Sequence, residues 1–324
     1  MTRTDTVFAP ASRHRDWSLR RCGRIVRLTL LVLALCSHGR AVIAEGIPAI
    51  PAALQECLPA AEDILAIVNR RPVLGADVRV RMLTTPLSEQ QQPRLLEDYV
   101  QQAIDRELMD QFLAKRKVDV PETLIEERVR VFRERAGGEA GLARMGLDDA
   151  SLHAQVSLSL RWLKHAQGIL TDQQFRDYFQ QHRSQLDGTR LRIEQVFRQW
   201  NADATQADRA AIKAELQSLR TELVSGQKSF ADITGDGADL GWMTSRGNLP
   251  TEVLTAAFGL EGSRISEVIE SPQGLHIIRV VDRIPGQLSL EDVRMDVLSA
   301  LSAQLWDEEV ARQRKTAQIE LMLP

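Results

Sequence analysis

Apolar residues recur every three or four positions over much of residues 93–179, which is the spacing of one face of a helix. The longest such stretch, residues 93–115, predicts an amphipathic helix. Further helices are predicted to begin at Pro121, at Asp149 and after Thr171, which opens a Thr-x-x-Gln capping box. Apolar stripes of this kind are typical of helices packed on a core, and an open binding groove is the alternative interpretation.

Alternation of apolar and polar residues, which is typical of strands, appears before this helical region and near residue 320. Residues 64–68 are predicted to form a strand, and the segment that follows them turns the chain into a second short strand. Residues 317–323 alternate as well. A helix is predicted before them, starting at the Ser-x-x-Asp capping box that Ser289 opens.

Residues 189–286 contain both the helical and the strand-like spacing of apolar residues within about 100 residues. Strands and helices mixed at this density predict a small α+β unit. The expected elements, in order, are a strand at 191–197, a helix at 203–226, a turn at 239–242, a short helix ending at Phe258, and strands at 265–269 and 275–281.

The order of these blocks resembles the parvulin domain of peptidyl-prolyl cis-trans isomerases, also called the PpiC or rotamase domain. The resemblance rests on the Asp-Leu-Gly-Trp turn at Asp239, on the turn glycines Gly262 and Gly274, and on the Gly-Leu-His-Ile-Ile strand that Gly274 opens. Near the start, Ala-Ile-Val-Asn-Arg-Arg-Pro-Val from Ala66 resembles the SurA/PrsA-type secreted chaperones.

These resemblances imply a fold of the α+β class. A mostly helical SurA-N-like chaperone domain would be closed by N- and C-terminal strands, with a parvulin-like α+β domain inserted into it. In such chaperones the end of the chain returns to the first domain, so residues 317–323 are expected to pair with residues 64–68. The expected segments are a signal peptide at 1–44, a flexible lead at 45–62, the first part of the chaperone domain at 63–188, the parvulin-like domain at 189–286, and the returning helix and strand at 287–324.

The resemblance also gives a candidate site, position by position. His276 stands where the family has its second histidine, and Gln195 stands where it has its first. The family's Ser-x-Asp segment is deleted, and Asp236 is the candidate replacement for its acidic residue. The expected substrate-binding residues are apolar: Leu240, Leu249 in place of a methionine, Val253 in place of the usual phenylalanine, and Phe258.

Prolyl isomerisation needs no covalent step, because its barrier of about 18–20 kcal/mol comes from resonance across the C–N bond. A catalyst has to bind the twisted amide better than either planar form. The substitutions at this site leave two roles open for His276. It either acts on the client's amide or holds strand ends together by hydrogen bonds.

Charge is divided unevenly along the chain. Residues 1–44 hold eight arginines and two aspartates, a net charge of +6; because the whole chain carries −3, residues 45–324 carry −9. A body this acidic argues against nucleic-acid binding. Arginines followed by the apolar run at 28–36 predict a signal peptide cleaved after Ala44, and hence a periplasmic or secreted protein. A membrane anchor is the alternative, but the run falls short of the roughly 20 residues that a span requires.

No cofactor or metal ion is expected, because the histidines lack metal-ligand spacing. After cleavage Cys57 is the one remaining cysteine, which excludes an internal disulfide and leaves an intermolecular bond or an unpaired thiol.

Two main hypotheses for function follow. The preferred one is a periplasmic folding chaperone that binds unfolded client segments, with a link to exopolysaccharide export suggested by some relatives of this size. The alternative is a catalytically active peptidyl-prolyl isomerase. A structural subunit with neither activity is a third interpretation.

Overall fold

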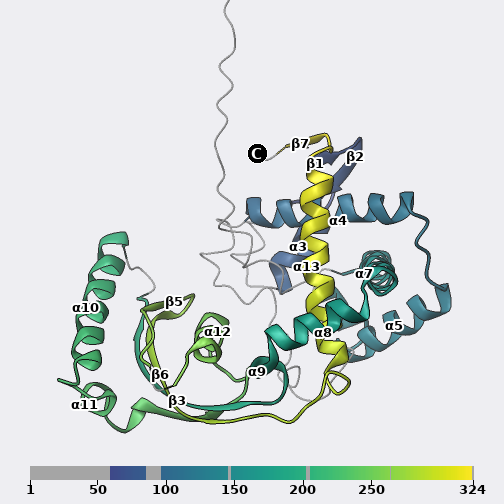
Figure 1. Cartoon of the computed structure of the whole chain (residues 1–324). Coiled ribbons are helices and arrows are strands. Elements are labelled where there is room, and N and C mark those ends of the chain that lie inside the picture. Colours follow the sequence, from purple (N-terminus) through teal and green to yellow (C-terminus); the bar gives the residue numbers. More distant parts are fainter. Residues whose placement is uncertain (1–58, 85–95, 145–146, 202–204, 263, 323–324) are drawn as a thin grey trace, which may run out of the picture. The chain divides into compact units, whose positions relative to one another are not determined.

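The computed structural model describes residues 59–84, 96–144, 147–201, 205–262 and 264–322, without the side chains of 80–84, 144 and 236. The described residues form two compact units, each with its own antiparallel sheet (Figure 1). The terminal unit comprises those in Met1–Gly168 and Ser302–Pro324, and the inserted unit is Ile169–Leu301. The mixture of helices with antiparallel sheets confirms the α+β class. The inserted unit contains the segment 189–286, whose exact boundaries stay a prediction.

The sheet of the terminal unit joins the two ends of the described chain. Its strand order is β2-β1-β7, with β1 at Ile64–Val68, β2 at Arg71–Leu74 and β7 at Ile319–Leu321. Both pairings are antiparallel, and β1 meets β7 at Ala66↔Leu321 and Val68↔Ile319. The expected return of the C-terminal strand to the first strand is therefore confirmed.

Helices build the rest of the terminal unit. The apolar face of α4 packs against the sheet, so that Val68, Val73, Ile104 and Leu108 lie in one buried cluster. None of the described helices combines the length and the apolarity needed to cross a bilayer. The helices are α3 (Gly75–Thr84), α4 (Leu96–Lys115), α5 (Glu122–Arg135), α6 (Glu139–Arg144), α7 (Asp149–Ile169) and the second half of α13 (Arg294–Arg314).

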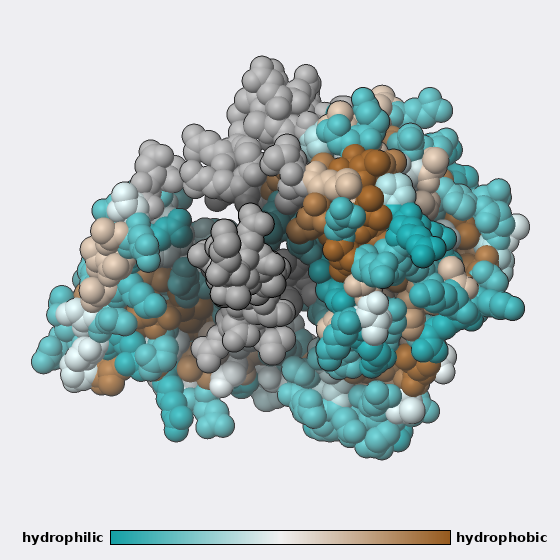
Figure 2. Space-filling view, turned by 90° about the horizontal axis from the view of Figure 1, so that it is seen from above, coloured by the Kyte–Doolittle hydropathy of each residue, from teal (hydrophilic) through white to brown (hydrophobic). Residues whose placement is uncertain are grey.

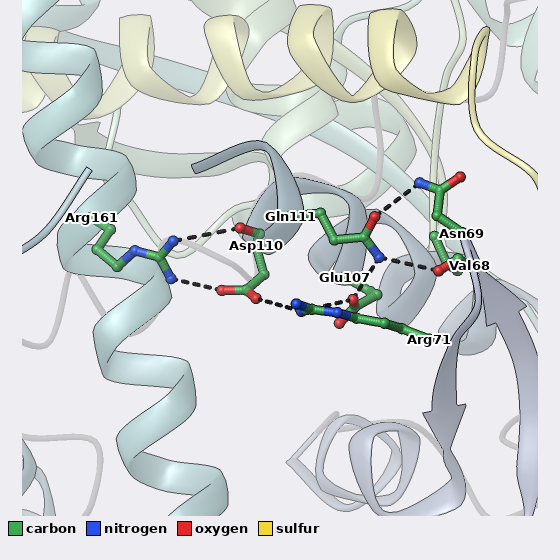
Figure 3. Close-up of polar contacts among 7 residues, drawn as sticks. All are labelled: Val68, Asn69, Arg71, Glu107, Asp110, Gln111 and Arg161. Carbon is green, nitrogen blue, oxygen red and sulfur yellow. Dashed lines mark hydrogen bonds and ion pairs between the residues drawn. The ribbon is translucent and has the colours of Figure 1, made fainter. Parts of the chain in front are cut away.

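Asn69 connects three parts of this unit. It and Arg70 have φ values of 49° and 74°, the left-handed pair of a tight hairpin, which asparagine tolerates better than most residues. Its side-chain Nδ2 donates to Gln111 Oε1 on α4 at 2.9 Å, and its Oδ1 accepts from the backbone N–H of Gln318 at 2.9 Å, just before β7. Gln111 in turn donates to the carbonyl of Val68 at 3.1 Å (Figure 3).

A chain of charges extends this network across the helices. Arg71 lies 3.5 Å from both Glu107 and Asp110 of α4, and Asp110 accepts from Arg161 of α7 at 2.7 Å (Figure 3). Arg161 Nε also donates to the carbonyl of Val118 at 3.0 Å. These contacts fix the hairpin, α4 and α7 to one another.

The inserted unit is built on a four-stranded antiparallel sheet of order β4-β3-β6-β5. The long central pair, β3 and β6, extends from Arg190↔Ile284 to Gln199↔Gly274, with one shift of register between Arg192 and Ile193. The strands are β3 (Arg190–Gln199), β4 (Asp239–Met243), β5 (Ile269–Ser271) and β6 (Gly274–Ile284). The helices are α8 (Asp172–Gln181), α9 (Arg183–Leu186), α10 (Gln206–Val224), α11 (Phe230–Thr234), the 3₁₀ helix η4 (Gly235–Ala238), α12 (Thr251–Gly259) and the first half of α13.

Alternation along the central strands produces two cores, one on each face of the sheet. Ile193 and Ile278 pack with Val253 and Phe258 of α12, which we call the α12 core. Val196 and Ile277 pack on the other face, in the core that includes the residues of α10 and α11.

Two predictions need correction: the position of the strand expected at 265–269 and the start of the last helix. The predicted strand at 265–269 is observed as β5 at Ile269–Ser271, and Ile265 forms only an isolated bridge to Arg279. The reason is that the Ser266 side chain accepts from the Ile278 N–H at 3.0 Å, in place of a backbone carbonyl. Ser289 and Asp292 form the expected capping contacts, but α13 begins at Arg294.

The two chain segments that flank the sheet are clamped together. Asp187 Oδ1 accepts from the N–H and the hydroxyl of Thr189, and the Thr189 hydroxyl accepts from the Gly286 N–H at 3.0 Å. The Leu288 N–H donates to the Asp187 carbonyl at 2.9 Å. A Cβ on Gly286 would lie 2.0 Å from that carbonyl oxygen, so the clamp requires glycine there.

We expect Asn69→Ala to lower the free energy of unfolding by about 2–4 kcal/mol, because it removes two hydrogen bonds and places alanine in a left-handed turn. Urea unfolding followed by circular dichroism measures this. The control is Asn201→Ala, which alters an exposed asparagine. A loss no larger than that of the control would contradict the connecting role of Asn69.

Gly286→Ala is expected to cost about 1–3 kcal/mol, because its methyl group overlaps the Asp187 carbonyl. Gly168→Ala is the matched control, since a Cβ at Gly168 meets nothing within 4 Å and alanine favours a helix. Thermal unfolding of both variants tests the clamp, which equal melting temperatures would disprove.

Candidate functional site

The candidate site lies on the α12 side of the central strands. His276 of β6 stands directly opposite Phe197 of β3, and Gln195 lies two residues along β3 on the same face. The His276 ring stacks on the Phe197 ring, with centroids 4.6 Å apart and an interplanar angle of 21°. The fold therefore brings His276 and Gln195 together, although 81 residues separate them.

Both ring nitrogens of His276 are hydrogen-bonded. Nδ1 lies 3.1 Å from Gln195 Oε1, and Nε2 lies 2.7 Å from Ser271 Oγ. Because an amide oxygen only accepts, Nδ1 carries the proton and Nε2 accepts from the Ser271 hydroxyl. The ring thus links β3, β5 and β6.

Burial also sets the charge of this ring. His276 is only 2% exposed, and burial lowers its pKa to about 4, while the nearby Glu252 carboxylate partly opposes that effect. The imidazole is therefore neutral at neutral pH. It offers one hydrogen-bond donor and one acceptor, both already engaged, and no positive charge to stabilise a carbonyl oxygen.

Ser271 is a member of the site that the sequence reasoning missed. Its hydroxyl accepts from the N–H groups of Gln273 and Gly274 at 3.2 Å each, a serine-centred turn that the Ser-Pro-Gln-Gly sequence could have revealed. A Ser-His-Gln series matches the connectivity of a nucleophile, base and orienting group. Ser271 is only 2% exposed, however, so its oxygen is not accessible for attack on a substrate.

The four predicted substrate-binding residues gather in one place, the α12 core. Leu240 and Leu249 are partly buried at its edge. Val253 is 0% exposed and Phe258 is 6% exposed, so both side chains pack against the sheet. In this arrangement an accessible apolar surface comes from Leu240 and Leu249, while their role in binding stays a prediction.

Asp236 lies in η4, and its side chain is outside the described part of the structure, so its predicted role stays untested. No group of His, Cys, Asp and Glu among the described side chains is arranged to hold a metal ion. Cys57 and the predicted signal peptide also lie outside the described residues.

Comparison with known proteins assigns the inserted unit to a family. The family model described as the PPIC-type PPIASE domain matches residues 170–295. The foldase protein PrsA of Halalkalibacterium halodurans is 25% identical over 225 residues, which cover 62% of each chain. Chaperone SurA of Chromohalobacter salexigens is 25% identical over 246 residues, which cover 68% of this chain and 56% of SurA. Both matches thus span less than two thirds of the relative's own length.

A peptidyl-prolyl isomerase is also similar to part of this chain. The peptidyl-prolyl cis-trans isomerase Pin1 of Digitalis lanata is 35% identical over 85 residues, which cover 24% of this chain and 70% of that protein. The match therefore covers most of the length of that isomerase. The protein described here therefore belongs to the PPIC-type, or parvulin, family of peptidyl-prolyl cis-trans isomerases, and PrsA and SurA are among its relatives.

Proposed function

We propose that this protein is an exported folding chaperone whose parvulin unit binds unfolded client segments and accelerates prolyl isomerisation weakly or not at all. The observation that carries the proposal is the state of His276, which is buried, neutral and hydrogen-bonded at both nitrogens. A ring in this state stabilises strand ends. It has no free polar atom to direct at a client's amide.

The apolar part of the site supports the same proposal. A proline ring needs a slot whose walls are exposed, and Val253, at the position of the usual slot phenylalanine, is 0% exposed. Leu240 and Leu249 offer a shallower surface, which suits weak contact with many sequences. Binding that tolerates many sequences is what a chaperone requires.

The relatives and the surface of the terminal unit favour a chaperone role for the rest of the chain. PrsA is named a foldase and SurA a chaperone. Large apolar residues are exposed at the small sheet, where Ile64, Leu321 and Met322 are 45%, 44% and 42% exposed. The space-filling view shows brown, apolar areas among the teal residues of the surface (Figure 2). Exposed apolar surface of this kind can hold extended, unfolded segments.

Export is part of the proposal. The arginine-rich segment and the apolar run at 28–36 support cleavage after Ala44 and a periplasmic or secreted location. Clients in exopolysaccharide export stay a prediction from the resemblance alone.

An active isomerase is the second candidate, and membership of the parvulin family favours it. Gln195 and His276 are adjacent, and Asp236 is the third residue that this candidate would require. Together they would polarise the amide while Leu240 and Leu249 hold the proline ring.

A protease-coupled assay on a proline peptide, run beside an aggregation assay on an unfolded protein, separates the two candidates. We expect isomerisation within about tenfold of the uncatalysed rate, together with suppressed aggregation, because no free catalytic group faces the client. A large acceleration that His276→Ala abolishes would establish the enzyme instead. His182→Ala, at the end of α8, is the control.

Stability is expected to fall as the pH drops from about 6.5 to about 4. The folded state keeps His276 neutral down to a pKa of about 4, whereas the unfolded chain takes up the proton near 6.5, so protonation favours unfolding in this window. The contribution is up to about 3 kcal/mol. Urea midpoints at several pH values measure it, and His276→Asn should flatten the dependence relative to His182→Asn. An equally steep profile in both variants would contradict this assignment.

A further inference from the structure

The strand β7 has an open edge within the described part of the chain. It lies at the border of the sheet of order β2-β1-β7, and no described strand pairs with it on its outer side. Just before and just after β7, the Gln318 carbonyl and the Met322 N–H bond to the hairpin segment that contains β1, at 2.9 and 3.0 Å. Because backbone groups alternate in direction along an antiparallel strand, those of Ile319 and Leu321 point away from β1.

The other three edge strands of the two sheets are protected against pairing with another chain. β2 contains Pro72, which has no N–H to donate. β4 contains Gly241, whose φ of 74° lies where the pairing with β3 is irregular. At β5, the Ser271 carbonyl accepts from Trp200 Nε1 at 3.2 Å. Among the described edge strands, β7 alone has neither a proline, a left-handed residue nor a bonded side chain of this kind.

The side chains of β7 suit an extended segment of alternating character. Ile319 packs against the buried cluster formed by the small sheet and α4, and Leu321, on the same face of the strand, is exposed. Glu320 points to the opposite face and is exposed as well. An added strand would therefore meet apolar side chains on one face and a carboxylate on the other.

The charge at this edge favours a client segment over a second copy of the chain. Two copies of β7 paired antiparallel about their central residue would set Glu320 opposite Glu320, and like charges directly opposite are destabilising. A lysine or arginine at that place forms a favourable cross-strand pair instead. The charge of −9 on residues 45–324 also repels a second copy and attracts basic segments.

We propose that β7 receives an extended client segment as an added antiparallel strand, and that it prefers segments with a lysine or arginine between two apolar residues. The backbone groups of the two apolar residues bond to those of Ile319 and Leu321, and the cation lies opposite Glu320. Main-chain hydrogen bonds give such binding its tolerance of sequence, and the side chains give the preference. The inference rests on the proposed binding of unfolded clients and specifies a surface and a class of segment.

Seven-residue fluorescent peptides with a central Val-Lys-Val, whose binding to the whole protein is followed by anisotropy, test the proposal. Backbone N-methylation of the two valines should weaken binding about 3- to 10-fold, because it removes the N–H groups that face β7. N-methylation of the lysine is the matched control, since its N–H points away from β7, and it should change the affinity less than about twofold. These peptides require no change to the protein.

Variants of β7 test the same contacts from the other side. Leu321→Pro removes an outward N–H and leaves the inward bond of Met322 in place, so it should weaken binding of Val-Lys-Val more than Leu321→Ala does. A Val-Glu-Val peptide should bind about 2- to 5-fold more weakly than Val-Lys-Val at low salt, and Glu320→Gln should remove this difference. Glu308→Gln, at an exposed position of α13, is its control.

Equal binding of the valine-methylated and unmethylated peptides, no detectable binding of Val-Lys-Val, or a lysine preference that survives Glu320→Gln would each overturn the proposal. A dimer that Leu321→Pro abolishes, seen by analytical ultracentrifugation, would assign the edge to a second copy. Aggregation suppression on the same variants reports on the chaperone function separately. Suppression without these peptide effects contradicts only the role of β7, and the peptide effects without suppression contradict only the chaperone.

Discussion

The antiparallel pairing of β3 with β6 is the interaction on which the inserted unit depends. It spans β3 from end to end, and its alternating side chains supply both cores, with Ile193 and Ile278 on one face and Val196 and Ile277 on the other. The same register sets His276 opposite Phe197. A slip of one residue would exchange the two faces and separate the histidine from Gln195, so fold and site share one constraint.

The terminal unit depends on a comparable constraint at its small sheet. Three strands of three to five residues are too short to be stable by themselves, and the pairing of β1 with β7 joins segments about 250 residues apart. Asn69 and Gln111 satisfy polar groups where this sheet meets α4, so the junction carries hydrogen bonds as well as apolar contacts. Closing the sheet in this way places the inserted unit, Ile169–Leu301, between two segments of the terminal unit.

The neighbours of His276 determine which polar atoms the candidate site can offer to a ligand. His276 donates to the amide oxygen of Gln195, the residue predicted to stand at the family's first histidine, and the Phe197 ring covers one face of the imidazole. Burial of the ring keeps it neutral by lowering its pKa. Of the four apolar residues predicted to bind substrate, Leu240 and Leu249 are partly exposed and the other two are buried, and the proposed recognition of client segments rests on this arrangement.

The sequence by itself determined the α+β class, the return of the last strand and most of the strands and helices of the inserted unit, because periodicity, turn residues and family motifs are local signals. Only the tertiary structure decided that Val253 and Phe258 are buried, that Ser271 holds His276, and that Ser266 interrupts a predicted strand. Burial, hydrogen-bond partners and electrostatic neighbours depend on residues brought together from distant segments, which no local pattern records.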